Sequence, residues 1–124
     1  MKEFGDLESA IMDALWAADR PLSVREVRER MHYDRAVAYT TVMTVAGILF
    51  RKGLLRREKT GRAWRYWPHE TRAEHAARLM GEVLATGGDR KVTMVRFIER
   101  CSDEEVTRLH DVLAEARARR GIAS

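Results

Sequence analysis

Residues 38–52 read Ala-Tyr-Thr-Thr-Val-Met-Thr-Val-Ala-Gly-Ile-Leu-Phe-Arg-Lys, and this stretch decides the fold. Apolar side chains recur at helical spacing through Val42, Val45 and Leu49, which predicts a helix with one buried stripe. The opposite stripe carries hydroxyls, a glycine and an arginine but no acid, whereas an ordinary solvated helix surface carries Glu and Lys. Such a stripe suits close approach to the phosphates and base edges of DNA. The alternative interpretation is that the threonines merely fill a helix surface.

Two further helices are predicted upstream of this stretch. The first runs from Asp6, a candidate cap, to Ala18, and Asp19-Arg20-Pro21 ends it because proline cannot continue a helix. The second is short and starts at Ser23-Val-Arg-Glu26, where Ser and Glu have the spacing of a capping box. A polar break at residues 32–35 separates it from the third helix, which spans about residues 38–52. This arrangement predicts a helix-turn-helix.

A β-hairpin is predicted downstream. Gly53 is well placed to end the third helix, and residues 54–59 and 64–68 flank a turn that contains Gly61. Aromatic residues in the second run favour a strand. Three helices followed by a basic hairpin is the order of a winged helix-turn-helix, in which the third helix enters the major groove and the wing follows the backbone.

The net charge of the 124-residue chain is +4, but it is unevenly distributed. Residues 35–67 hold eight Lys or Arg against the single acid Glu58, a net +7, whereas residues 1–34 sum to −3 and residues 68–124 to zero. A concentrated basic segment indicates a polyanion-binding surface, although a solvated basic face without a partner has the same charge. Because this window coincides with the predicted third helix and wing, charge and topology together favour DNA binding.

Three more amphipathic helices are predicted after Pro68, starting near the capping boxes Thr71-x-x-Glu74 and Ser102-x-x-Glu105 and at Asp89. They are too short to form a robust core of their own, so we expect them to pair with a second copy of the chain. Folding back onto the N-terminal part is the alternative. The predicted domains are residues 1–70, for DNA binding, and residues 71–124, for dimerisation. The apolar residues predicted to dimerise are Leu79, Met80, Val83, Val95, Ile98, Leu109 and Leu113.

The chain resembles the penicillinase-repressor family of the BlaI/MecI type. The most specific string is Tyr-Thr-Thr-Val-Met-Thr at residues 39–44, and Lys-Gly-Leu at 52–54 and the wing residues 61–68 also fit. The resemblance covers nearly the whole chain. It implies a mainly α protein with a small β-hairpin, namely a winged helix-turn-helix followed by a C-terminal helical dimerisation region. It also implies a homodimeric transcriptional repressor that binds a dyad operator and controls antibiotic-response genes of the β-lactam-resistance kind.

Carried onto this sequence, the resemblance gives the residues that face the operator. They are Thr40, Thr41, Met43, Thr44, Arg51 and Lys52 on the third helix and at its end, and Arg62 and Arg65 on the wing. For the two wing arginines, solubility of the wing is the alternative role. Gly47 departs from the long residues of the family, and it either permits close DNA approach or weakens the helix.

A further departure concerns inactivation. Some family members are cleaved at an Asn-Phe bond, and the matching pair here is Arg96-Phe97. Cleavage at this bond, and with it a regulatory protease as partner, is therefore only a hypothesis. The family's copper-responsive relatives carry a cysteine-rich tail, whereas Cys101 is the single cysteine of this chain, and we expect it to be structural rather than a redox sensor.

Several classes of function are disfavoured. The four histidines lack metal-ligand spacing, and no nucleophile-elbow, Walker or HExxH string is present, so we expect no enzyme, no metal and no cofactor. No run approaches the ~18 apolar residues of a membrane span, so we expect a cytoplasmic protein without membrane contact. The competing hypothesis is a winged-helix adaptor that binds other proteins and lacks sequence-specific DNA binding.

Overall fold

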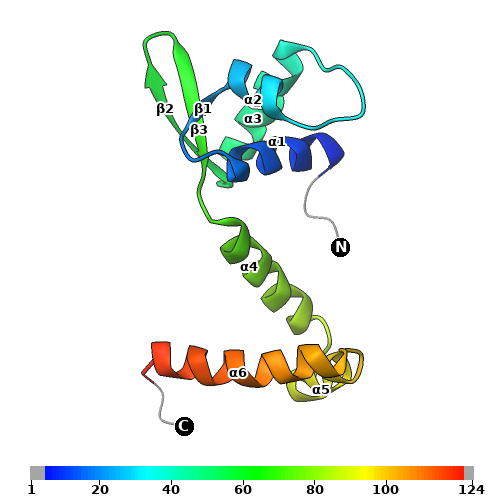
Figure 1. Ribbon diagram of the computed structural model, residues 1–124. Coiled ribbons are helices and arrows are strands. Elements are labelled where there is room, and N and C mark those ends of the chain that lie inside the picture. Colours follow the sequence, from blue (N-terminus) through cyan, green and yellow to red (C-terminus); the bar gives the residue numbers. More distant parts are fainter. Residues whose placement is uncertain (1–4, 122–124) are drawn as a thin grey trace. The chain divides into compact units, whose positions relative to one another are not determined.

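The computed structural model describes residues 5–121, and residues 1–4 and 122–124 of the predicted domains lie outside them. The elements are α1 (Asp6–Ala17), β1 (Leu22–Ser23), α2 (Val24–Arg30), α3 (Tyr39–Arg51), β2 (Leu55–Thr60), β3 (Ala63–Pro68), α4 (Arg72–Ala85), α5 (Arg90–Glu99) and α6 (Asp103–Arg119) (Figure 1). The protein is mainly helical with one small sheet, as predicted. The chain divides after Ala76 into two compact units, here called the head (residues 5–76) and the tail (77–121). The assignment of DNA binding to residues 1–70 and dimerisation to 71–124 stays a prediction.

The core of the head lies between its three helices and the sheet. Val42 and Leu49 of α3 are fully buried in one cluster with Ile11 of α1 and Val27 of α2, so the apolar stripe predicted for the third helix packs into the core. Leu22 and Tyr66 extend this core onto the sheet. The head therefore has a hydrophobic core of its own, which fixes α3 with its other side turned to solvent.

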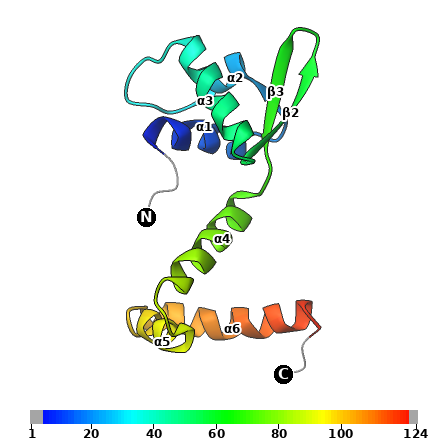
Figure 2. The same cartoon turned by 180° about the vertical axis from the view of Figure 1, so that it is seen from behind.

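The sheet has three antiparallel strands in the order β1-β3-β2. The β2–β3 hairpin is the predicted wing, and it extends beyond the three helices of the head in both views (Figures 1 and 2). The sequence did not predict β1. This strand has only Leu22 and Ser23, which pair with Tyr66 and Arg65, so it is too short to show an alternating pattern.

The ends of α3 and α1 follow backbone rules. Gly53 has φ +82°, its N–H donates to the Phe50 carbonyl at 3.0 Å, and the Leu54 N–H donates to the Leu49 carbonyl at 3.0 Å. These bonds form a Schellman motif, which needs a left-handed residue and so favours glycine. At the start of α1 the prediction that Asp6 caps the helix is wrong, because Gly5 is the cap residue and Asp6 is already helical.

The tail consists of most of α4 together with α5 and α6. Its predicted capping box at Ser102 is confirmed, since Ser102 accepts from the Glu105 N–H and Glu105 accepts from the Ser102 N–H. Within the described part of the tail, residues 77–121, no side chain is buried. None of the described helices has the length and apolarity that a membrane span requires.

Candidate nucleic-acid interface

The solvent-facing side of α3 carries most of the predicted DNA-binding residues. Thr40, Thr41, Met43 and Thr44 are all exposed. The Thr44 hydroxyl donates to the Thr40 carbonyl at 2.9 Å, a bond that holds the hydroxyl against the helix and leaves the threonine methyl free for apolar contact. Tyr39, at the N-terminus of the helix, is as exposed as Met43, and sequence analysis did not select it. Tyr39 belongs to the string Tyr-Thr-Thr-Val-Met-Thr at residues 39–44, and this position could have identified it as a candidate DNA-binding residue.

Gly47 and Arg51 lie one helical turn apart on α3 and face each other. Gly47 is buried, and a Cβ built on it would meet Arg51 Nη1 at 3.5 Å. The Arg51 guanidinium therefore lies over Gly47. Within residues 5–121 Arg51 forms no ion pair, so it is available to an external anion. Since 3.5 Å is an ordinary contact distance, Gly47 is not required by lack of space inside the head.

Two other predicted DNA-binding residues are held by carboxylates of the head. Lys52 Nζ lies 3.3 Å from Glu8 Oε2, and Arg65 Nη1 lies 3.0 Å from Glu26 Oε1. Both pairs are partly exposed, so a phosphate could compete for either cation. Their role in DNA binding stays a prediction. Arg62 lies in the turn of the hairpin and is exposed, and within the described residues it has no ion-pair partner.

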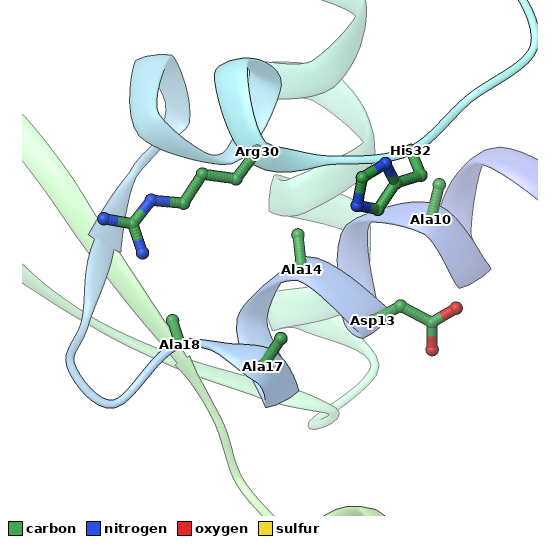
Figure 3. Close-up of a pocket in the computed structure, with 7 residues that line it drawn as sticks. All are labelled: Ala10, Asp13, Ala14, Ala17, Ala18, Arg30 and His32. Carbon is green, nitrogen blue, oxygen red and sulfur yellow. The ribbon is translucent and has the colours of Figure 1, made fainter.

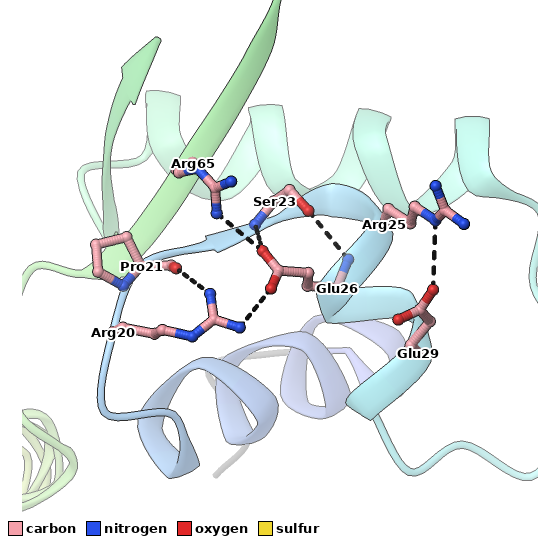
Figure 4. A network of polar contacts seen from close by, with 7 residues as sticks. All are labelled: Arg20, Pro21, Ser23, Arg25, Glu26, Glu29 and Arg65. Atoms are coloured by element: carbon pink, nitrogen blue, oxygen red, sulfur yellow. Dashed lines mark hydrogen bonds and ion pairs between the residues drawn. The ribbon is translucent and has the colours of Figure 1, made fainter. Parts of the chain in front are cut away.

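Glu26 is the centre of a polar network that joins the wing to α2 (Figure 4). Its carboxylate accepts hydrogen bonds from Arg20, Arg65 and the Ser23 N–H, while the Ser23 hydroxyl accepts from the Glu26 N–H. The predicted capping box is thus confirmed, and two arginines share its acid. The hydrogen bond from Arg20, followed by that from the Ser23 N–H, lowers the pKa of Glu26 to about 2.

The wing also presents two cations that sequence analysis did not select. Arg57 and Lys59 pair across the hairpin with Tyr66 and Trp64, so these four side chains share one face. The Arg57 guanidinium lies 4.0 Å from the ring centre of Phe50 on α3 and 4.1 Å from that of Trp64. Side chains alternate between the two faces of a strand, and this alternation could have placed Arg57 and Lys59 on one face from the sequence alone.

A hollow of about 170 Å³ lies elsewhere on the head, beside α1 (Figure 3). Its floor is formed by alanines of α1 and the residue after it, and Arg30, His32 and Asp13 stand around it. None of the residues predicted to contact DNA lines it. The hollow therefore lies outside the candidate interface.

The apolar residues predicted to dimerise are uncovered in the single chain. Met80 is 66% and Leu113 58% exposed, and the others are exposed except Leu79, which is half-buried. Phe97 is also exposed, and it lies with Arg96 inside the helix α5. The Cys101 thiol, half-buried, donates to the Phe97 carbonyl at 3.4 Å, a local contact that agrees with a structural role. Among the described residues, no group of three or more acids, His or Cys could hold a metal ion.

The start of α4 is anchored on α1 inside the head. Trp16 Nε1 donates to the Glu70 carbonyl at 3.0 Å, and the Trp16 ring lies 5.3 Å from the ring of His75, which is buried. Arg72 pairs with Asp13 and lies over the same indole. Trp16 is therefore a packing residue of the head and not a platform for bases.

The chain is similar to known transcriptional regulators along most of its length. The family model described as penicillinase repressor matches residues 4–115. The "Transcriptional regulator BlaI" of Mycobacterium tuberculosis, from strains CDC 1551 / Oshkosh and ATCC 25618 / H37Rv, is 41% identical, and the match covers 98% of this chain and 90% of the relative. A solved MarR family protein from Bacillus stearothermophilus aligns with 97% of this chain and 77% of its own, with a TM-score of 0.47 and 19% identity.

The family model covers far more than half of the chain, and it spans both the head and most of the tail. The predicted resemblance is therefore confirmed, and with it the expectation of a transcriptional regulator rather than an enzyme. The chain belongs to the penicillinase repressor family.

Proposed function

We propose that the protein is a homodimeric transcriptional repressor that binds a dyad operator through α3 and the basic wing. One observation carries the proposal. The exposed side of α3 has no acid and lies next to a wing with several cations, whereas the other parts of the chain are acidic or neutral overall. A surface with this charge and these small side chains fits the major groove and the adjacent backbone.

The residues divide by role. Thr40, Thr41 and Met43 face outward from the first turns of α3 and would contact base edges, where methyl groups and hydroxyls distinguish thymine from other bases. Arg51 and Arg62 have no carboxylate partner among the described residues and would bind phosphates. These arginines would position the head on the duplex without reading its sequence.

The tail supports the dimer. It exposes large apolar side chains on all three of its helices and buries none in its described residues. Apolar surface of this extent marks an interaction site, and a second copy of the tail offers a matching one. Two heads related by a two-fold axis would bind two half-sites of a palindromic operator.

The proposal extends to the regulated genes and to the release of repression. The similar mycobacterial protein is named BlaI, so we assign antibiotic-response genes of the β-lactam-resistance kind to this repressor. A regulatory protease that cuts between Arg96 and Phe97 is part of the same proposal. Because this bond lies within α5, cleavage would require local opening of the helix.

Fluorescence anisotropy tests the DNA-binding part. The probes are a labelled duplex from the protein's own promoter and a scrambled duplex of the same composition. We expect tighter binding to the promoter duplex and an affinity that falls steeply as salt rises. Arg51→Ala should weaken DNA binding without changing the thermal midpoint. Arg108→Ala makes the same charge change in the tail, and it should leave the affinity for DNA unchanged.

Two results would contradict the proposal. Equal affinity for both duplexes at the same salt concentration would exclude a specific operator. Absence of binding to either duplex, together with a stoichiometric protein partner in a pull-down, would favour the adaptor function instead.

A further inference from the structure

Arg57 occupies an unusual position between α3 and the wing. Its guanidinium lies between the rings of Phe50 and Trp64, at 4.0 and 4.1 Å from the two ring centres. One ring belongs to α3 and the other to β3, and both restrict the side chain because a planar guanidinium stacks on aromatic faces. Arg57 is therefore held in one place before any ligand arrives.

The hydrogen-bonding capacity of this guanidinium is largely unused. Nε is buried and has no partner, and Nη1 donates only to the Tyr66 hydroxyl at 3.5 Å, a long bond. Within the described residues Nη2 makes no hydrogen bond, and it is not among the fully buried atoms that lack one. A buried apolar side chain would fill the same space without an unpaired N–H group, so packing alone does not account for an arginine here.

The face of the hairpin that carries Arg57 has no acid. The strand register places Leu55, Arg57 and Lys59 on one face of the hairpin with Trp64 and Tyr66, and Lys59 Nζ lies 5.7 Å from the Trp64 ring centre. Glu58, the only acid of the wing, pairs in register with Arg65 on the other face. The face that contacts α3 through Phe50 therefore carries two cations and no carboxylate.

We propose that Arg57 is a preorganised binding residue for a backbone phosphate of duplex DNA at the junction of α3 and the wing. This inference rests on the proposed function and adds to it a residue that positions the head. Nη2 makes no hydrogen bond within the described residues and is not fully buried, so its N–H groups suit a phosphate, to which an arginine donates charge-assisted hydrogen bonds, whereas the buried Nε stays out of reach. Because the two rings restrict the side chain beforehand, less conformational entropy is lost on binding than for a free surface arginine.

The test compares variants of the full-length protein in the same anisotropy assay over a range of salt concentrations. Arg57→Gln removes the charge and keeps most of the side chain, whereas Arg57→Lys keeps the charge. The matched control is Arg56→Gln. Arg56 is the adjacent strand residue, points to the opposite face and donates to His69 Nδ1 at 2.8 Å.

We expect Arg57→Gln to weaken binding to promoter and scrambled duplexes alike, by roughly tenfold, because a phosphate contact carries no sequence information. The slope of log affinity against log salt should become shallower by about one. Arg57→Lys should keep the slope and lose less affinity. Arg56→Gln, which removes the same charge from the opposite face of the wing, should change both quantities less than Arg57→Gln does.

A second variant separates positioning from packing. Trp64→Leu removes one ring and keeps the charge, so it should weaken binding and leave the salt slope unchanged. If Arg57→Gln lowers the thermal midpoint but leaves the slope and the affinity as in the wild type, Arg57 is a structural stacking residue and the inference is wrong. If the wild type binds neither duplex, the proposed function fails as well, so the two failures are distinguishable.

Discussion

Nη1 of Arg65 on β3 donates to Oε1 of Glu26 on α2 at 3.0 Å, so a single carboxylate joins the wing to the helix-turn-helix. Arg20, from the turn before β1, binds the other oxygen of the same carboxylate. The wing is thereby fixed relative to the helices by a polar contact as well as by the core. The contact also reduces the freedom of Arg65 to reach DNA.

Because of this network, we expect the head to lose stability as the solution becomes acidic. The pKa of Glu26 is about 2 in the folded protein, below the usual 4.5, chiefly because of the hydrogen bond from Arg20. Protonation therefore favours the unfolded state. The contribution of Glu26 is fully present above about pH 4.5 and is lost as the pH falls towards about 2. Thermal midpoints measured across this range should fall more steeply for the wild type than for Glu26→Gln. Parallel curves would contradict this prediction.

Two glycines of the head should respond to alanine with opposite signs. Gly53 has φ +82°, so Gly53→Ala strains the backbone and should destabilise the head by about 1 kcal/mol. Gly47 lies inside α3 with helical backbone, and an added Cβ meets only the end of Arg51 at an ordinary distance. Gly47→Ala should therefore stabilise the head by roughly 0.5–1 kcal/mol. Urea unfolding measures the change in the free energy of unfolding for both variants. If both changes have the same sign, this distinction between the two glycines is wrong.

Release of Lys52 from its carboxylate should strengthen DNA binding. Glu8→Gln removes the charge that holds Lys52 at 3.3 Å but keeps a side chain that can accept from the Gly5 N–H. We expect an affinity several-fold higher in the anisotropy assay and a stability within about 1 kcal/mol of the wild type. Glu29→Gln, which frees Arg25 on α2, is the control and should change the affinity less. If Glu8→Gln binds DNA with the affinity of the wild type, Lys52 does not belong to the DNA-binding surface.

The oligomeric state should depend on the tail. Sedimentation of the full chain should give a dimer, and residues 1–76 alone should give a folded monomer, because the head has its own core. Leu113→Glu places a charge on a residue that is 58% exposed in the single chain, and it should weaken association at least about tenfold if that residue is covered. His110→Glu, an exposed polar position on the same helix, is the control. A dimeric truncation would place the interface in the head.

Much of the fold could be predicted because its signals are local. The capping boxes at Ser23 and Ser102 and the glycine after α3 each depend on a few neighbouring residues, and all are found where the sequence predicted them. Contacts between distant residues gave no such signal. The strand β1 exists only because Leu22 and Ser23 pair with β3, and Arg57 meets Phe50 only once the hairpin lies against α3. The two predicted DNA-binding cations with carboxylate partners, Lys52 and Arg65, could not be recognised as paired for the same reason.

The lack of buried side chains in the tail has a consequence for how the protein is made. The head leaves the ribosome first, and it can fold at once because its core is complete within one chain. The tail follows, and nothing in its described residues gives it an interior of its own. The helices of a newly made tail therefore keep their apolar faces in water until another surface covers them. In the proposed dimer, the last step of maturation is therefore an encounter between two copies of the chain, and its rate depends on how many copies the cell contains.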